Sequence, residues 1–181
     1  MSRRGLTPGE VGEGRRVFGD SIDWGRVRIV EETGWPLALA RAVARLQRLP
    51  PPAHNAVTLG HRVFFSRRLH TDNTEAAALR RSDLAWLIHE LAHVWQFKRL
   101  GIGALWDMVR PHLRQGVDPY DYGGAEGLST DGAPKSLSAF TLEQQAEIAR
   151  DYYYRLDSGE DTRRWEPLIQ PLRRLCPGAT R

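Results

Sequence analysis

The stretch His89-Glu90-Leu91-Ala92-His93 constrains this chain more than any other part of its sequence. It lies in an apolar run whose periodicity predicts a helix capped by Ser82 and ending at Gly101. Residues four apart share one face of a helix, so the two imidazoles would project side by side and could bind one Zn²⁺. Glu90, one position further round, could take a proton from a water molecule on the same metal.

Two histidines alone do not complete such a site, because a zinc hydrolase needs three protein ligands and one open position. The chain has a single cysteine, Cys176, which leaves His, Asp or Glu as ligands. The third ligand could be His112, an acidic residue of the predicted long loop 115–138, or a glutamate of a second predicted helix, 140–156. That helix carries Glu143 and Glu147, which are four apart and share a face. One could bind the metal while the other orients a ligand imidazole.

The order His89-Glu90-x-x-His93 followed by Glu143-x-x-Ala146-Glu147 resembles the gluzincin clan of zinc peptidases. The resemblance implies an α+β, zincin-like fold, in which a small sheet accompanies the HExxH helix and a second, Glu-bearing helix. It also implies Zn²⁺ held by His89, His93 and Glu143, with Glu147 orienting His89. The chain departs from the commonest pattern in having Glu rather than Asp at position 147 and no Asn before Glu143.

Further segments, such as Val17-Phe18-Gly19-Asp20 and Thr58-Leu59-Gly60, resemble a group of uncharacterised bacterial metallopeptidase-like domains. Members of this group are associated with contractile injection systems and secreted effectors. The resemblance implies a secretion-system component and leaves the substrate open.

A strand or hairpin is predicted over 56–65, directly before the histidine helix. The resemblance implies that the strand ending Val63-Phe64-Phe65 is an edge strand that pairs with an extended peptide or protein substrate. The expected activity is that of a zinc-dependent metalloendopeptidase with Glu90 as general base. Stabilising the oxyanion requires one more donor, for which Tyr120, Tyr122 and His112 are candidates. We favour Tyr122, because its loop joins the two ligand helices and could fold over the cleft.

The length of 181 residues predicts a single domain over 1–181, with residues 1–20 at its periphery. Thr7 and Glu10 form a capping-box pattern at the start of a first helix that ends at Phe18. The remaining predicted elements are a strand at 27–30 and helices at 35–49, 103–113 and 165–175.

The net charge is +4 and the pI about 9.6, with arginines scattered along the chain. This pattern favours a solvated basic surface over nucleic-acid binding. No apolar run could span a bilayer and no signal-peptide core follows Met1, so we expect no membrane partner. We expect a protein that is cytoplasmic as synthesised and that could be exported only without a cleavable signal.

Two other functions stay open on these residues. The chain could be a catalytically silent zincin-like binding or structural module. It could also be a SprT-like protease acting near DNA, which the basic pI and the order His-Glu-x-x-His-x-Trp suggest. That group uses His or Cys rather than Glu as third ligand.

Overall fold

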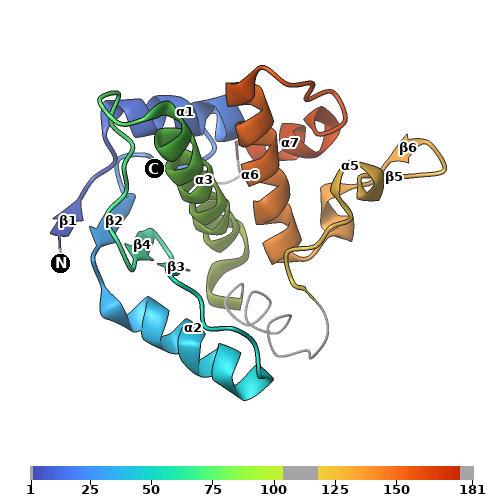
Figure 1. Ribbon diagram of the computed structural model, residues 1–181. Helices are drawn as coiled ribbons and strands as arrows, with labels where there is room; N and C mark the ends of the chain where they lie inside the picture. The colour runs from blue at the N-terminus through green and yellow to red at the C-terminus, as the bar shows by residue number, and fades with distance from the viewer. Residues whose placement is uncertain (1, 104–117, 176–181) are drawn as a thin grey trace.

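The computed structural model describes residues 2–103 and 118–175. Within these ranges the protein is mixed α/β, with a small four-stranded sheet and six α-helices (Figure 1). The expected α+β class agrees with this arrangement. The predicted helix 103–113 lies almost wholly outside the described residues.

The sheet has the strand order β1-β2-β4-β3. Its strands are β1 (Ser2–Arg4), β2 (Arg28–Glu31), β3 (Ala56–Leu59) and β4 (Arg62–Phe65). The strands β1 and β2 are antiparallel, β2 and β4 parallel, and β3 and β4 antiparallel. The strands β3 and β4 form the predicted hairpin, and Gly60 supplies the positive φ of 62° that its tight turn requires.

Helices lie on both faces of the sheet. Helix α2 (Gly34–Gln47) covers one face, where Trp35 meets Phe64 edge to face with ring centroids 5.2 Å apart. The other face carries Ile29, Val63 and Phe65, all fully buried against the core. The sheet is therefore packed on both sides, and the helix that carries His89 and His93 lies on the side opposite α2.

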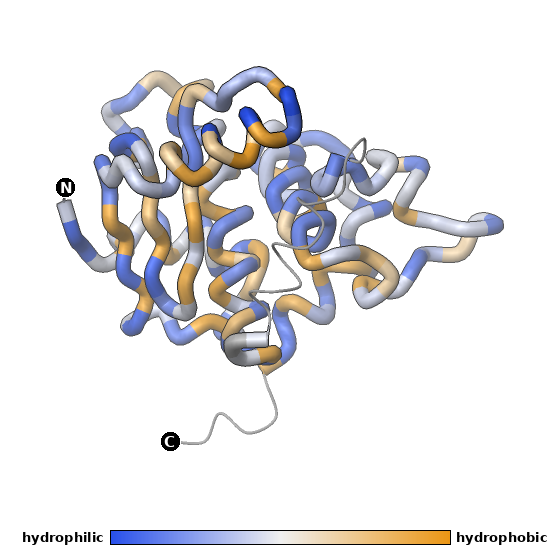
Figure 2. The backbone as a smooth tube through the Cα atoms, turned by 90° about the horizontal axis from the view of Figure 1, so that it is seen from below, coloured by the Kyte–Doolittle hydropathy of each residue, from blue (hydrophilic) through white to orange (hydrophobic). Residues whose placement is uncertain are grey.

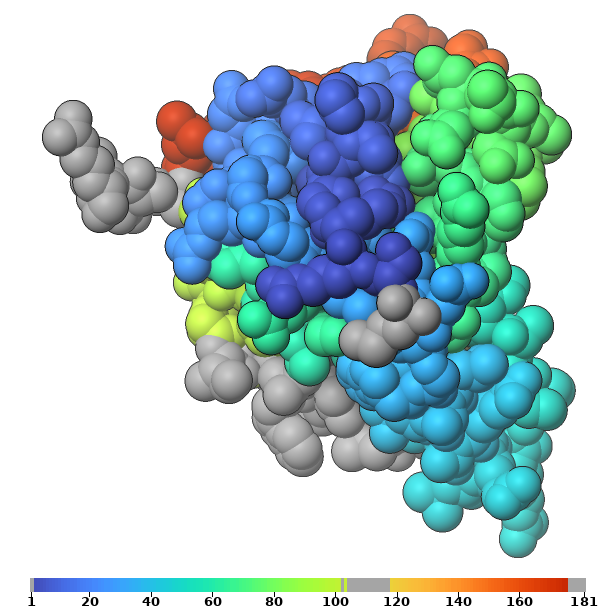
Figure 3. Space-filling view, turned by 90° about the vertical axis from the view of Figure 1, so that its left-hand side faces the viewer, coloured from blue at the N-terminus to red at the C-terminus, as the bar shows by residue number. Residues whose placement is uncertain are grey.

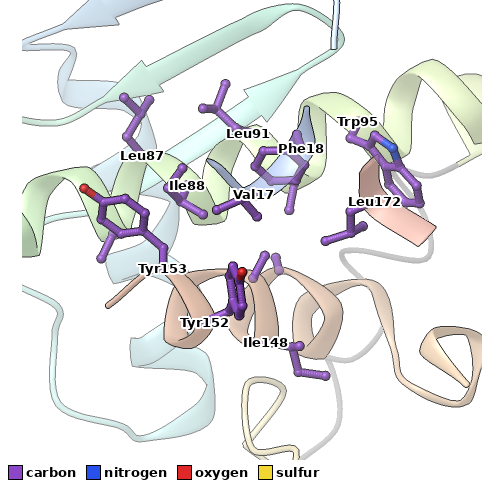
Figure 4. Packing of buried hydrophobic residues seen from close by; sticks show 14 of the residues in the cluster. Val17, Phe18, Leu87, Ile88, Leu91, Trp95, Ile148, Tyr152, Tyr153 and Leu172 are labelled. Atoms are coloured by element: carbon purple, nitrogen blue, oxygen red, sulfur yellow. The ribbon is translucent and has the colours of Figure 1, made fainter. Parts of the chain in front are cut away.

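Two long helices form the centre of the molecule. They are α3 (Ala77–Leu100) and α6 (Leu142–Ser158), which pack along each other (Figure 1). Leu87 and Leu91 of α3 point toward the strands, and Ile88 points toward Tyr152 of α6 (Figure 4). Because α3 is buried on both sides, the position of its histidines relative to α6 is set by core packing.

Two shorter helices complete the core. They are α1 (Pro8–Phe18) and α7 (Glu166–Arg173), which contact each other. The predicted capping box of Thr7 and Glu10 at the start of α1 is confirmed. Residues 1–20 were expected at the periphery, but β1 joins the sheet, and Val17 and Phe18 of α1 are fully buried.

The start of α3 differs from the prediction. The helix begins at Ala77, so Ser82 is not its cap and Asp83 lies inside it. Asp83 is fully buried because the Arg67 guanidinium, the backbone N–H of His70 and the ring of the same histidine all contact its carboxylate. The carboxylate of Asp83 thus lies inside the helix rather than in its first turn, and residues of the preceding loop supply its hydrogen bonds.

The stretch predicted as a long loop contains short regular elements where it is described. They are α5 (Gly124–Gly127) and a small hairpin of β5 (Ser129–Thr130) and β6 (Ala133–Pro134). Figure 2 shows this hairpin projecting at the end of the molecule opposite the sheet. Among the described residues, no helix is both long and apolar enough to cross a membrane.

Candidate metal centre

The packing of α3 against α6 brings three ligand groups together. His89 and His93 come from α3 and Glu143 from the first turn of α6, and all three residues are about 5% exposed. Their ligand atoms all lie within 4.8 Å of one another. The structure therefore assembles a possible metal-binding group from the residues predicted as the three ligands.

The distances within this group suit a small tetrahedral metal ion. One carboxylate oxygen of Glu143 lies 3.5 Å from Nε2 of His89 and 3.4 Å from Nε2 of His93. Two ligand atoms at zinc–nitrogen and zinc–oxygen bond lengths on a tetrahedron are separated by about 3.4 Å. Two imidazoles and one carboxylate are also a donor set that catalytic zinc sites use.

The other ring nitrogen of each histidine contacts a side chain that orients it. Nδ1 of His89 lies 3.2 Å from the carboxylate of Glu147, and Nδ1 of His93 lies 2.8 Å from the side-chain oxygen of Gln96. Such contacts favour the tautomer in which Nδ1 carries the proton, and the lone pair of Nε2 is then available to a metal ion. Glu147 thus lies where the sequence pattern predicts an orienting carboxylate.

Gln96 is itself held in place by α6. Its amide nitrogen donates to the backbone oxygen of Leu142 and lies 3.3 Å from the side-chain oxygen of Gln145. Gln145 in turn donates to the backbone oxygens of Leu137 and Phe140. This chain of amides fixes the His93 ring relative to the α6 N-terminus. The sequence offered one indication of this role for Gln96, namely its position about one helical turn beyond His93.

The centre carries excess negative charge that favours a cation. Burial opposes protonation of His89, but Glu143, Glu147 and Glu90 outweigh it and raise its pKa to about 10. The pKa of His93 is raised for the same reason, chiefly by the charge of Glu143 against the cost of burial. A divalent cation would satisfy these carboxylates in place of protons.

The carboxylate of Glu90 is held by the sheet. The hydroxyl of Thr58 in β3 donates to a Glu90 carboxylate oxygen at 2.7 Å, and both residues are about 5% exposed or less. Glu90 is close enough for its charge to raise the pKa of both histidines. Thr58 lies 32 residues from Glu90 in the sequence, so pattern analysis offered no signal for this contact.

The two loop tyrosines occupy different environments. The hydroxyl of Tyr122 donates to Asp151 and accepts from the Trp165 indole, and the residue is 8% exposed. The ring of Tyr120 instead lies beside His89, with centroids 5.7 Å apart. The structure therefore directs the Tyr122 hydroxyl to Asp151, and places Tyr120 beside the ligand group. The pKa of Tyr120 is raised, first by burial and then by the charges of Glu143, Glu90 and Glu147, so its hydroxyl keeps its proton.

The outer strand beside the centre is β3, contrary to the expectation for β4. The strand β4 pairs with β2 on one side and β3 on the other, so Val63-Phe64-Phe65 has no open edge. The backbone oxygen of Asn55 accepts from Ser66, which continues the hairpin ladder in its alternating pattern. Ala56 and Thr58 consequently direct their backbone groups away from β4. The composition of β4 does not distinguish an inner strand from an edge strand, because the distinction depends on its pairing with the distant strand β2.

Two residues weighed from the sequence, His112 and Cys176, lie outside the described residues.

Comparison with known proteins finds a similarity to a secretion-system protein. The sequence is 31% identical over 153 residues to the type VI secretion system spike protein VgrG2b of Pseudomonas aeruginosa. The alignment covers 83% of this chain and 13% of that protein, so the chain spans a small part of its relative's length. No protein-family model matches the sequence. No solved structure matches it either, and the zincin-like fold therefore stays a prediction.

Proposed function

We propose that this chain is a zinc-dependent metalloendopeptidase. The observation that carries the proposal is the convergence of His89, His93 and Glu143 at spacings that suit zinc, with Glu90 beside them. When bound there, zinc would act as a Lewis acid toward a peptide carbonyl and make a water molecule more acidic.

Side chains of the protein would then transfer the protons and orient the metal ligands. Glu90 takes the proton of the attacking water and delivers it to the leaving amine. The buried hydroxyl of Thr58 holds one Glu90 oxygen, which leaves the other to face the water. Glu147 and Gln96 keep the two imidazoles in their metal-binding orientation.

Tyr120 is the proposed donor to the oxyanion, in place of the Tyr122 favoured from the sequence. Its ring lies against His89, and its raised pKa keeps the phenol protonated and able to donate. The Tyr122 hydroxyl already contacts Asp151 and Trp165.

An extended peptide would bind along β3. The backbone groups of Ala56 and Thr58 point away from β4, on the side of β3 that pairs with no other strand among the described residues, and Ala56 is only half-buried. Because the Thr58 side chain contacts Glu90, a peptide paired at this residue would have a backbone carbonyl close to the general base.

The similarity to a type VI secretion spike protein supports action within, or delivery by, such a system. We propose that peptide-bond hydrolysis is the activity that this segment contributes to it.

Metal analysis and a peptide assay test the proposal together. The purified wild type should carry roughly one zinc per chain. His93→Ala and Glu143→Ala should lose the metal, whereas Glu90→Gln should keep it. Incubation with a mixed peptide library, read by mass spectrometry, should yield products with the wild type and none with Glu90→Gln. Identical product spectra for these two proteins would refute the peptidase proposal, and full zinc retention by Glu143→Ala would remove Glu143 from the ligand set.

A further inference from the structure

Helix α2 exposes a stripe of apolar side chains. The stripe consists of Trp35, Leu39, Ala42 and Leu46, with Leu49 just beyond the helix. Leu39 is 52% exposed and Leu46 78% exposed. Their spacing of four, three and four residues keeps them on one face of a helix about 21 Å long. The opposite face packs on the protein through the buried Pro36 and Ala44, and Trp35, at the end of the stripe, also contacts Phe64 of β4.

Three arginines flank this stripe along the helix. Arg41, Arg45 and Arg48 are exposed and recur at spacings of four and three, so they form a row beside the leucines. Arg41 contacts the backbone oxygen of Pro52. No ion pair between these arginines and a carboxylate occurs within residues 2–103 and 118–175. Their charge is therefore not compensated by any carboxylate in these two ranges.

The surrounding sequence extends the positive charge. Residues 33–71 contain six arginines and neither Asp nor Glu. Since the whole chain has 26 basic and 22 acidic residues, the remainder has 20 against 22 and is net negative. The arginines are scattered along the chain, but the absence of acids concentrates net positive charge in the segment that contains α2, β3 and β4.

We infer that the α2 face binds the surface of an anionic lipid bilayer. An exposed row of Leu with a terminal Trp suits the boundary between headgroups and acyl chains, and a parallel row of Arg suits lipid phosphates. Nucleic acid would use the arginines and leave the leucines exposed to water. Charge complementarity and the apolar stripe together thus favour a lipid surface.

The position of α2 allows this contact. Figure 1 shows α2 at the lower margin of the molecule, away from α1, α6 and α7, and Figure 3 shows residues of this region projecting from the body. The helix could lie flat on a membrane while the rest of the protein stays in water. Surface binding needs no spanning segment, so the lack of one in the described residues does not bear on it.

Vesicle flotation of the purified full chain tests the inference without any peptide substrate. Phosphatidylcholine vesicles with about one quarter phosphatidylglycerol should carry the protein upward, and pure phosphatidylcholine vesicles should carry little. The Leu39→Gln/Leu46→Gln pair should weaken this partitioning at least about tenfold. The Arg41→Gln/Arg45→Gln pair should weaken it on the order of tenfold and reduce its dependence on salt.

Matched exposed pairs provide the controls. Leu79→Gln/Leu175→Gln and Arg163→Gln/Arg164→Gln change the same residue types elsewhere on the surface and should bind as the wild type does. All changed side chains are exposed, so circular dichroism melts should stay close to that of the wild type. Three results would overturn the inference: a wild type that does not bind anionic vesicles, a leucine pair that still binds fully, or a wild-type dimer in solution that the leucine pair dissociates.

Discussion

The hydroxyl of Thr58 lies 2.7 Å from a carboxylate oxygen of Glu90, and both side chains are buried. This contact joins the outer strand β3 to the centre of α3 at the residue proposed as general base. It also means that the strand proposed to bind the peptide and the group proposed to activate water share one hydrogen bond. We therefore expect the position of β3 to influence the proposed hydrolysis directly.

Replacing Thr58 by Val should lower turnover of a cleaved peptide about 10- to 100-fold, because a hydrogen bond to a charged group contributes about 1.5–3 kcal/mol. The zinc content should not change, since the Thr58 hydroxyl donates to Glu90, which is not one of the three proposed ligands. Steady-state kinetics check this, and Thr58→Ser, which keeps the hydroxyl, should restore turnover. Equal kcat for Thr58→Val and the wild type would show that the contact has no role in positioning Glu90.

Gln96→Leu should reduce metal affinity about 10- to 100-fold, because the His93 ring loses the partner that fixes its tautomer. Competition with a zinc-binding dye measures the change. The exposed Gln170 on α7 provides the control, since Gln170→Leu is the same replacement away from the site. An unchanged affinity in Gln96→Leu would mean that α6 packing alone orients His93.

The two tyrosines should separate activity from stability. Tyr120→Phe should lower kcat for peptide cleavage by about 10- to 100-fold, because the proposed oxyanion donor is lost. Its effect on thermal stability should be smaller than that of Tyr122→Phe, because Tyr120 is 38% exposed and the variant keeps the ring that lies against His89. Tyr122→Phe should instead lower the free energy of unfolding by about 1–3 kcal/mol, because Asp151 and Trp165 lose their partner. Denaturant unfolding and steady-state kinetics on both variants measure this, and the reverse pattern would restore the catalytic role to Tyr122.

Acid should destabilise the protein through Glu10. Burial raises the pKa of this carboxyl, but the hydrogen bonds from Arg4, Thr7 and Thr71 outweigh burial and lower it. The unfolded state then binds more protons than the native state below about pH 4.5, so stability falls as pH falls through that range. Glu10→Gln should cost about 3 kcal/mol near pH 7 and flatten this dependence, as measured by urea unfolding at several pH values. A slope equal to that of the wild type would assign the acid sensitivity to other carboxylates.

Removing metal should lower the melting temperature. Three carboxylates gather around His89 and His93, and a bound cation relieves their repulsion. A ligand at about one hundred times its Kd stabilises by about 2.7 kcal/mol, which corresponds to roughly 5–10 °C for a chain of this size. Calorimetry with and without a chelator measures the shift. Glu143→Ala should show none, and a chelator effect of equal size in that variant would place the metal elsewhere.

Local sequence signals predicted local structure well. Thr7 and Glu10 form the predicted capping box, and Thr141 and Gln144 form a second capping box at the start of α6. Each of these depends on residues within one turn of one another, where backbone geometry decides the outcome. The signals failed where a distant residue intervened: Arg67 holds Asp83 inside α3, and β2 pairs with β4 and makes it an inner strand.

The sequence by itself determined that His89 and His93 share a helix face with Glu90 next to them, because helical periodicity alone places them there. It also indicated a second helix with Glu143 and Glu147 on one face. Only the tertiary structure decided that these two faces meet, since α3 and α6 are separated in the chain and joined by core packing. The same packing supplied Thr58, Gln96 and Tyr120 to the centre and left the leucines of α2 exposed. Such contacts depend on how whole elements bury their apolar faces, and no short sequence pattern records them.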